Sequence, residues 1–314
     1  CGSGTGAVTY ATTGTCTESN GVLTVGNAGS TCTVTATKAG DSQYVAVSSS
    51  AQTITITKAN QSISFVSLPS SPTALGNYSV IATSSSGVTV TFTIAANSAS
   101  VCSVSGNTVS FLTSGSCEIL ADQAGNDNWN AAPQASQTIS VGKGAQVVLF
   151  TSSAPTDAVV DGSTYTVVAV GGHGTASVIS SISSASSSVC SISSGVVSFN
   201  AAGDCVVELN QAGDGNYNAA PQVTQTITVG KGAQVVAFTS NAPTGVRVDD
   251  SGYVPTASGG ASSSAVTITV ASASSQICAI ANGEVSFHAV GDCILQVNQA
   301  GDANYNAAVQ VTQT

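Results

Sequence analysis

The chain repeats itself with a period of 88 residues, and this period constrains the fold more than any other feature. Two sets of cysteines keep that spacing, namely Cys102, Cys190 and Cys278, and Cys117, Cys205 and Cys293. The segment 211–244 recurs with few changes at 123–156 and begins again at 299–314. A unit of this length is large enough for one small domain. The chain is therefore predicted to be a tandem array of similar domains.

The register of the repeat predicts the domain boundaries. Full units are expected at 58–142, 143–230 and 231–314, and the last strand of 231–314 is cut short. Residues 1–57 match only the back part of a unit, so its front strands are missing. Either this sequence is a piece of a longer chain or neighbouring subunits complete the partial units, and the first interpretation is favoured.

Strand patterning dominates each unit. Apolar residues alternate with threonine over 88–94 and again over 266–270, which indicates strands with one apolar face and one hydroxyl face. Each full unit is expected to hold seven short strands and no helix longer than a turn. Pro255 has no backbone N–H, so its strand should be an edge strand or be interrupted. The fold class is predicted as all-β, with tandem immunoglobulin-like sandwiches. Because the VGKGAQ junctions are short, the sandwiches are expected to line up as a rod.

The composition excludes several function classes. Charged residues make up 6% of the chain and the net charge is −10, with 5 basic residues, so a nucleic-acid interface is excluded. The 42% of hydrophobic residues can bury a core, which argues against disorder. No apolar run is long enough to cross a membrane as a helix. With no repeated constellation of catalytic groups, an enzyme is not expected, and neither is a cofactor.

Each unit carries one pair of cysteines at a fixed spacing, which predicts one disulfide inside each unit. The pairs are Cys16 and Cys32, Cys102 and Cys117, Cys190 and Cys205, and Cys278 and Cys293. A zinc site is the alternative, but zinc needs four close ligands and each unit offers only these two. Disulfides indicate an oxidising compartment. Cys1 has no counterpart, so an unseen upstream partner, an intermolecular bond and a lipid anchor all remain open for it.

A resemblance to a known family rests on one long run. From Cys190 the sequence passes through SFNAAGDC to QAGDGNYNAAPQVTQTITV, and this run resembles the bacterial immunoglobulin-like repeats of large surface proteins. The resemblance covers 58–314 well and 1–57 in part. It implies an extracellular bacterial protein whose repeats act as spacers, stalks or adhesive arms.

One aromatic residue follows an Asn- and Asp-rich turn in each unit. The set is Tyr44, Trp129, Tyr217 and Tyr305. These rings would stack on sugar if they were exposed, which makes the turn a candidate binding site. A single ring in a turn more commonly packs down as an anchor while its polar atom finds a partner.

Other candidates for chemistry are weaker. The oxygen-rich turns at 214–218 and 302–306 offer a calcium site, although tight turns need the same residue types for their own geometry. Lys58, Lys143 and Lys231 lie at unit junctions, which disfavours an isopeptide cross-link inside a core. The glycosylation sequons at Asn60 and Asn77 fit a secreted protein but arise easily by chance in such a chain.

The sequence therefore predicts an extracellular or cell-surface structural protein, a stiff stalk or filament segment made of tandem disulfide-stapled repeats. One alternative is an adhesin arm that binds glycans or a cell surface. Another is a fibre subunit completed by strand exchange. The expected partners are further repeats of the same chain or like subunits.

Overall fold

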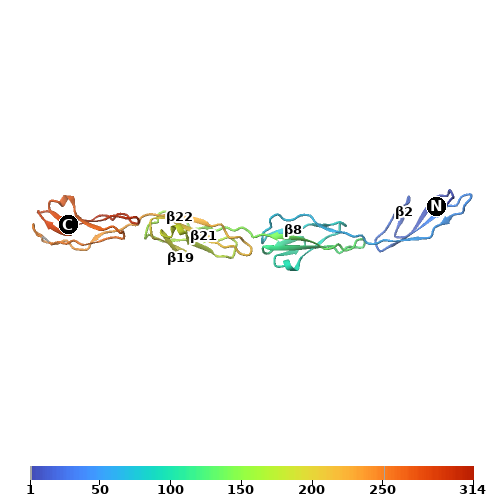
Figure 1. Ribbon diagram of the computed structural model, residues 1–314, viewed down its shortest axis with the longest axis horizontal. Helices are drawn as coiled ribbons and strands as arrows, with labels where there is room; N and C mark the ends of the chain where they lie inside the picture. Colours follow the sequence, from blue (N-terminus) through green and yellow to red (C-terminus); the bar gives the residue numbers. More distant parts are fainter. Residues whose placement is uncertain (1, 251) are drawn as a thin grey trace. The chain divides into compact units, whose positions relative to one another are not determined.

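A computed structural model describes residues 2–250 and 252–314 (Figure 1). The chain is all-β, and it divides into two compact units. The first unit comprises Cys1–Gly144 and Gly215–Tyr217, and the second comprises Ala145–Asp214 and Asn218–Thr314. Each unit contains two sets of strands, and the ladders of each set stay within that set.

In the first unit, the second set of strands forms a complete sandwich. Its strands are β7 Ile63–Phe65, β8 Asn77–Ser79, β9 Ala82–Ser84, β10 Thr91–Ile94, β11 Cys102–Ser105, β12 Thr108–Phe111, β13 Gly115–Asp122 and β14 Ala135–Val141. One sheet has the order β10-β13-β14, the other has the order β8-β12-β11, and β7 pairs with β9. Alternate residues of β12, β13 and β14 are buried between the sheets, including Val109, Ile119 and Ile139. We call this set the second sandwich.

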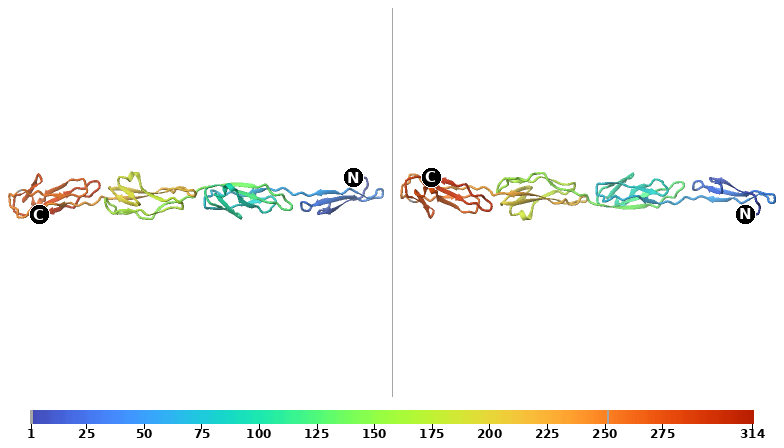
Figure 2. Two further views of the ribbon diagram at one scale, coloured as in Figure 1. Left: turned by 90° about the horizontal axis from the view of Figure 1, so that it is seen from below. Right: turned by 90° about the horizontal axis from the view of Figure 1, so that it is seen from above.

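In the second unit, the third sandwich repeats this arrangement. Its strands are β15 Leu149–Phe150, β16 Tyr165–Thr166, β17 Ala169–Val170, β18 Val178–Ile182, β19 Cys190–Ser193, β20 Val196–Phe199, β21 Gly203–Gln211 and β22 Val223–Val229. The sheets β18-β21-β22 and β16-β20-β19 enclose a core that contains Val197, Val207 and Ile227. Figure 2 shows its two layers of strands from two sides.

The fourth sandwich, also in the second unit, is less complete. Its strands are β23 Ala237–Phe238, β24 Ala257–Ser258, β25 Val266–Val270, β26 Cys278–Ala281, β27 Glu284–Phe287, β28 Leu295–Gln299 and β29 Val311–Gln313. Where the third sandwich has β16, the described residues of the fourth show only a single bridge, between Tyr253 and Val285. This bears out the expected effect of Pro255, because proline cannot donate to a ladder.

The first set of strands, in the first unit, lacks counterparts of β7, β8 and β9 among the described residues. Its strands are β1 Val8–Gly14, β2 Thr17–Ser19, β3 Val22–Thr24, β4 Thr31–Lys38, β5 Val47–Ser48 and β6 Gln52–Thr55. Strand β4 pairs with β1, β5 and β6, and β2 pairs with β3. Ile54 is 40% exposed, whereas its counterpart Ile139 in the second sandwich is 3% exposed. The apolar face of this first set is therefore partly open.

The expected count of seven strands in each full unit is wrong for the second and third sandwiches, which have eight. The difference comes from one stretch, TYTVVAV at 164–170, that looks continuous in sequence. Its first half, β16, pairs with β20, and its second half, β17, pairs with β15. The chain thus crosses from one sheet to the other within a few residues. The prediction of no long helix is confirmed for the described residues, where the 3₁₀ turns Ala96–Ser98, Ser184–Ser186 and Ser272–Ser274 are the only helical elements.

Disulfides join the two sheets of the sandwiches. The bridge Cys102–Cys117 links β11 to β13, and Cys190–Cys205 links β19 to β21. The bridge Cys278–Cys293 starts on β26 and ends two residues before β28. Cys16–Cys32 connects the start of the β2–β3 hairpin to β4. In the third sandwich both cysteines are almost wholly buried, so the bridge is part of the core.

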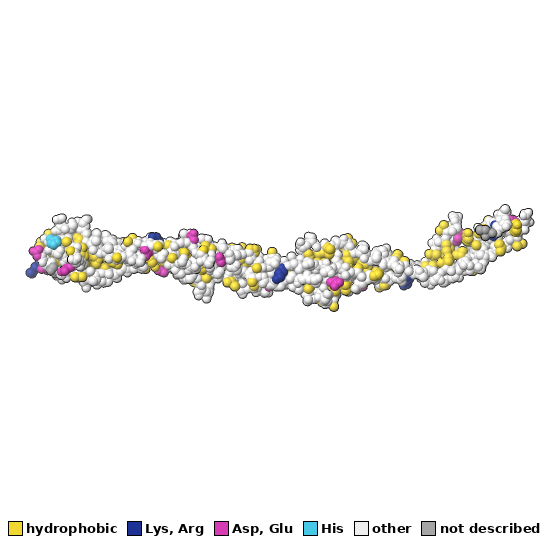
Figure 3. Space-filling view, viewed as in Figure 1, with side chains coloured by type: hydrophobic (Ala, Val, Ile, Leu, Met, Phe, Trp, Pro, Cys, Tyr) yellow, Lys and Arg dark blue, Asp and Glu magenta, His cyan; other side chains and the backbone are white. Residues whose placement is uncertain are grey.

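Few charged side chains lie on the face of the molecule drawn in Figure 3. The face of the molecule in Figure 3 is mostly white, the colour of backbone and neutral polar side chains, with scattered apolar and charged groups. This agrees with strands that place serine and threonine toward water.

We expect Cys190→Ala combined with Cys205→Ala to lower the free energy of unfolding of the third sandwich by about 3 kcal/mol, because the bridge closes a loop of 15 residues. Denaturant unfolding of the full chain under non-reducing conditions measures this change. Ser191→Ala, at an exposed position on the same strand, is the control. An unchanged transition in the double variant would contradict the prediction.

Candidate functional site

The turn aromatic Tyr305 serves as an anchor between two sandwiches. Its ring is half-buried and packs against the core of the third sandwich, although Tyr305 itself belongs to the fourth. Its hydroxyl donates a hydrogen bond to Asp161 Oδ2 of the third sandwich. That bond, through the negative charge of Asp161, raises the pKa of Tyr305. The ring is therefore engaged within the protein, as expected for an anchor rather than a sugar platform.

The neighbouring residue Asn304 adds a second bond at the same junction. Its Oδ1 accepts the backbone N–H of Ala202 at 3.1 Å. In the first unit, Asn128 does the same one position before Trp129, and its Oδ1 accepts the N–H of Ala28 at 2.9 Å. The two junctions lie in separate units, and each uses the same asparagine of the repeat.

Glycine makes the close approach at this junction possible. Gly232 bridges Tyr305 in a parallel β-bridge, and a Cβ at Gly232 would lie 2.7 Å from the Val160 carbonyl oxygen and 3.1 Å from the tyrosine ring. Such contacts are too short for any larger residue. Gly232 of the VGKG segment is therefore a structural part of the junction.

The other predicted turn aromatics differ in exposure. Trp129 is half-buried and forms a parallel β-bridge with Ala59. Tyr217 is half-buried and forms a parallel β-bridge with Gly144. Tyr44, in the first set of strands, is 51% exposed. The four positions therefore do not form one uniform exposed platform.

Asp302 is the turn residue that organises this region. Its Oδ2 accepts the backbone N–H of Ser263 at 2.9 Å, and its Oδ1 accepts the N–H groups of Asn304 and Tyr305 at 2.8 and 3.0 Å. These bonds, with that from Ser263 the strongest, lower the pKa of Asp302 to about 2. The carboxylate oxygens thus accept hydrogen bonds from backbone N–H groups of the protein itself. This role argues against the calcium site predicted for the turn. Among the described residues, no group of three or more His, Cys, Asp or Glu side chains is placed to hold a metal ion.

A buried pair of glutamines holds the turn to the rest of the fourth sandwich. Gln234 Nε2 donates to the carbonyl oxygens of Asn306 at 2.8 Å and Ala300 at 3.1 Å, and its Oε1 accepts the N–H of Ser262. Gln299 Nε2 donates to the carbonyl oxygens of Ser264 and Ser262, and its Oε1 accepts the N–H of Gly260.

The same pair recurs in the third sandwich as Gln146 and Gln211. All four side chains are buried. These glutamines were not among the residues predicted from the sequence, although their repeat is visible there. Glutamine recurs in GAQ at 144–146 and 232–234, and in QAG at 211–213 and 299–301.

Buried serines are a second set of structural residues that were not predicted from the sequence. Ser186 Oγ donates to the Asp204 carbonyl oxygen at 2.8 Å and accepts the Val206 N–H at 3.1 Å, which ties the 3₁₀ turn to β21. Ser274 makes the equivalent pair of bonds in the fourth sandwich. The serine-rich run at 180–190 is therefore in part structural. Serines 88 residues apart and four residues before a cysteine were the available signal.

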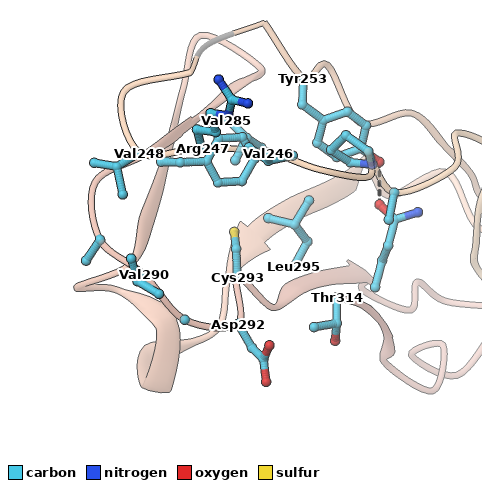
Figure 4. Close-up of a pocket in the computed structure, with 16 residues that line it drawn as sticks. Val246, Arg247, Val248, Tyr253, Val285, Val290, Asp292, Cys293, Leu295 and Thr314 are labelled. Carbon is cyan, nitrogen blue, oxygen red and sulfur yellow. Dashed lines mark hydrogen bonds between the residues drawn. The ribbon is translucent and has the colours of Figure 1, made fainter.

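An apolar groove of about 520 Å³ opens at the end of the fourth sandwich (Figure 4). We use the term apolar groove for the space lined by Val246, Val248, Val290, Cys293, Leu295 and Thr314. Val248 and Val290 lie on one side in Figure 4, with Leu295 and Thr314 toward the other. The charged residues Arg247 and Asp292 also line it. Tyr253 donates a hydrogen bond to Gln313 beside it.

The remaining candidates do not gather into a site. Cys1 lies outside the described residues, so its predicted intermolecular role stays a prediction. Lys231 Nζ donates to the Asp302 carbonyl oxygen at the junction. Asn60 Oδ1 accepts a hydrogen bond from Asn130 Nδ2 at 2.9 Å, and Asn77 lies exposed on β8. Of the helices in the described residues, none is long and apolar enough to cross a membrane.

No family model and no curated protein matches the chain. Among solved structures, Drosophila N-cadherin EC1-4 is 12% identical with a TM-score of 0.28, and the match covers 100% of this chain and 92% of that chain. The S-layer protein rSbsC(31-844) is 14% identical with a TM-score of 0.27, and the match covers 98% of this chain and 47% of that chain. Drosophila N-cadherin EC1-3 is 16% identical with a TM-score of 0.28, covering 71% of this chain and 87% of that chain. Superpositions this loose support no statement about ligands or partners.

We expect Gln299→Leu to destabilise the fourth sandwich by about 3 kcal/mol, because two carbonyl oxygens and one N–H lose their partner in a buried place. Thermal or denaturant unfolding of the full chain measures the change. Gln310→Leu is the matched control, since Gln310 is exposed and bonds only another side chain in this region. Equal effects of the two substitutions would refute a special role for the buried amide.

The pKa of Asp302 predicts a dependence of stability on pH. A folded-state pKa of about 2 lies below the ordinary aspartate pKa of 3.8, so ionised Asp302 stabilises the folded turn fully at pH values above 3.8. This stabilisation is expected to be lost as the pH falls from about 4 to about 2. Hydrogen exchange of the Asn304 and Tyr305 amides across this range, followed by NMR, measures the loss.

Asp302→Asn is the matched control for that measurement. Asparagine already stands at the equivalent position, Asn126, where its Oδ1 accepts the N–H groups of Asn128 and Trp129. The variant should keep those turn bonds while losing the dependence on pH. An equally strong dependence in the variant would assign the effect to another group.

Proposed function

We propose that this chain is a structural, non-enzymatic extracellular protein, a stiff stalk or filament segment built from tandem disulfide-stapled immunoglobulin-like units. The units are those of the repeat, 58–142, 143–230 and 231–314, preceded by the partial unit 1–57. The junction between the third and fourth sandwiches carries the proposal. There Tyr305 and Asn304 of one sandwich bond to Asp161 and Ala202 of the other.

A stalk needs junctions that resist bending, and three features of this junction support that property. The tyrosine ring packs on the core of the neighbouring sandwich, the asparagine bonds its backbone, and Gly232 allows the two to approach closely. The Asn128–Ala28 bond in the first unit indicates that the asparagine contact belongs to the repeat itself. Such contacts between neighbours allow an array to be lengthened by adding units.

The disulfides support the extracellular location, because bridges of this kind persist in oxidising compartments. A surface with little charge and many hydroxyl groups fits a structural role, in which no single repeated polar site is needed. The adhesive alternative requires free turn aromatics, and the engagement of Tyr305 weakens it.

A distance measurement within the second unit tests stiffness. Spin labels introduced through non-cysteine chemistry at Ser191 and Ala279, both exposed, report on the third and fourth sandwiches. We expect a narrow distance distribution in the unaltered chain. Asn304→Ala combined with Tyr305→Ala should broaden it, because the side-chain contacts across the junction are removed.

Tyr44→Ala serves as the control, since Tyr44 is the equivalent aromatic of the first set of strands and contributes nothing to the labelled junction. A broad distribution in the unaltered chain would overturn the proposal of a stiff stalk. Thermal unfolding of the double variant establishes that both sandwiches remain folded.

A further inference from the structure

In each complete sandwich, a segment near the start of the unit lies against the segment through which the chain leaves it. In the third sandwich, Val159 forms a parallel β-bridge with Gly230, which directly follows β22. The Gly230 N–H donates to the Ala158 carbonyl oxygen at 2.8 Å, and the Gly230 carbonyl oxygen accepts the Val160 N–H at 3.0 Å. We call this pair of hydrogen bonds the terminal clamp.

The second sandwich contains the same clamp. Thr73 forms a parallel β-bridge with Gly142, which directly follows β14. The Gly142 N–H donates to the Pro72 carbonyl oxygen at 2.9 Å, and the Gly142 carbonyl oxygen accepts the Ala74 N–H at 2.9 Å. These bonds match those of Gly230 one for one, so the clamp belongs to the repeat.

Buried side chains surround the clamp of the third sandwich. Ala158 and Val160 on one segment and Val229 at the end of β22 are all buried. The early segment is also bonded to the end of β20, because the Asp161 N–H donates to the Phe199 carbonyl oxygen at 3.0 Å. Water therefore has little access to the clamp, and the early segment is held in place when the exit segment is pulled.

The direction of the two segments decides how tension loads the clamp. Because the bridge is parallel, both segments run the same way along the sandwich. Tension on the chain draws 158–160 toward its N-terminal side and 228–230 toward its C-terminal side, so the two segments are pulled past each other. The hydrogen bonds cross between the segments, and this sliding strains both of them at once. A pull that separated the segments from one end would instead break the bonds one after the other.

From this arrangement we infer that the complete sandwiches bear tension along the chain, and that the terminal clamp is the part that resists unfolding under load. This inference rests on the proposed function, and it adds a mechanical role that a spacer without load does not need. Forced unfolding is governed by the rate of unfolding rather than by equilibrium stability. Two bonds that must fail together raise the barrier to unfolding more than the same bonds broken in turn.

Pulling on the full chain in two directions with optical tweezers tests the inference. Handles are attached through unnatural amino acids, at positions 143 and 231 to load the clamp in shear, and at positions 163 and 231 to peel it from one end. The residues replaced, Lys143, Ser163 and Lys231, are all exposed. At equal force we expect the third sandwich to unfold about tenfold more slowly in shear, the factor that corresponds to the loss of one hydrogen bond.

Two proline variants locate the resistance, both with handles at 143 and 231. Val160→Pro removes the N–H that Gly230 accepts, and it should speed unfolding under force by about tenfold. Val159→Pro is the matched control, because the N–H of the middle residue in a parallel bridge points away from the partner segment. Thermal unfolding establishes that the third sandwich of each variant is folded.

The disulfide identifies the sandwich that yields. The bridge Cys190–Cys205 keeps the 15 residues that it closes out of the released length. With a reducing agent present, the total released length should grow by about 5 nm, because an extended residue spans about 3.5 Å.

The inference is overturned if both pulling directions give the same unfolding rate, if the two proline variants unfold alike under force, or if reduction leaves the released length unchanged. The stiffness measurement is made without load, so its outcome is separate. A stiff junction with no dependence on pulling direction would leave the stalk proposal standing and remove the mechanical role. A rate that depends on direction, together with a flexible junction, would support the clamp and remove the stiff stalk.

Discussion

A covalent bond between two sheets lies at the centre of the complete sandwiches, and the rest of the structure depends on it. Each sandwich has short strands and a core of modest size, in which the bridged cysteines themselves are buried members. Small domains of this kind bury too little apolar surface to be very stable alone. Because the bridge fixes β19 against β21, and β11 against β13, the two apolar faces are held in register while the loops around them vary.

After the disulfides, hydrogen bonds from neutral side chains are the next contacts that hold the sandwiches together. Glutamine amides fill the places where many proteins would use ion pairs, and each one satisfies backbone donors and acceptors at once. The turn that they support presents Asn304 and Tyr305 to the preceding sandwich. The buried glutamine amides thus hold the turn in place, and the turn positions the two side chains that make contacts at the junction.

Much of the fold could be predicted from the sequence because its signals are periodic. The period of 88 marks the repeated cysteines, and alternation of valine or isoleucine with threonine marks the strands. The split of 164–170 between two sheets could not be predicted, because a continuous alternating stretch has the same pattern whether or not it changes partner. The glutamine and serine ties were missed because polar residues in an alternating pattern are expected to face water, and only the packed structure places Gln299 and Ser186 inside. The repeated spacing of those residues was the one sequence signal that pointed to them.

The scarcity of charge has a consequence for the settings in which such a chain holds its shape. Dissolved salt screens charges, over a distance of about 8 Å at physiological ionic strength. Here most of the contacts described within the third and fourth sandwiches are amide and hydroxyl hydrogen bonds together with disulfides, on which screening has little to act, and the Asp302 carboxylate is a charged exception. Charge screening by salt therefore has few contacts to weaken within these two sandwiches.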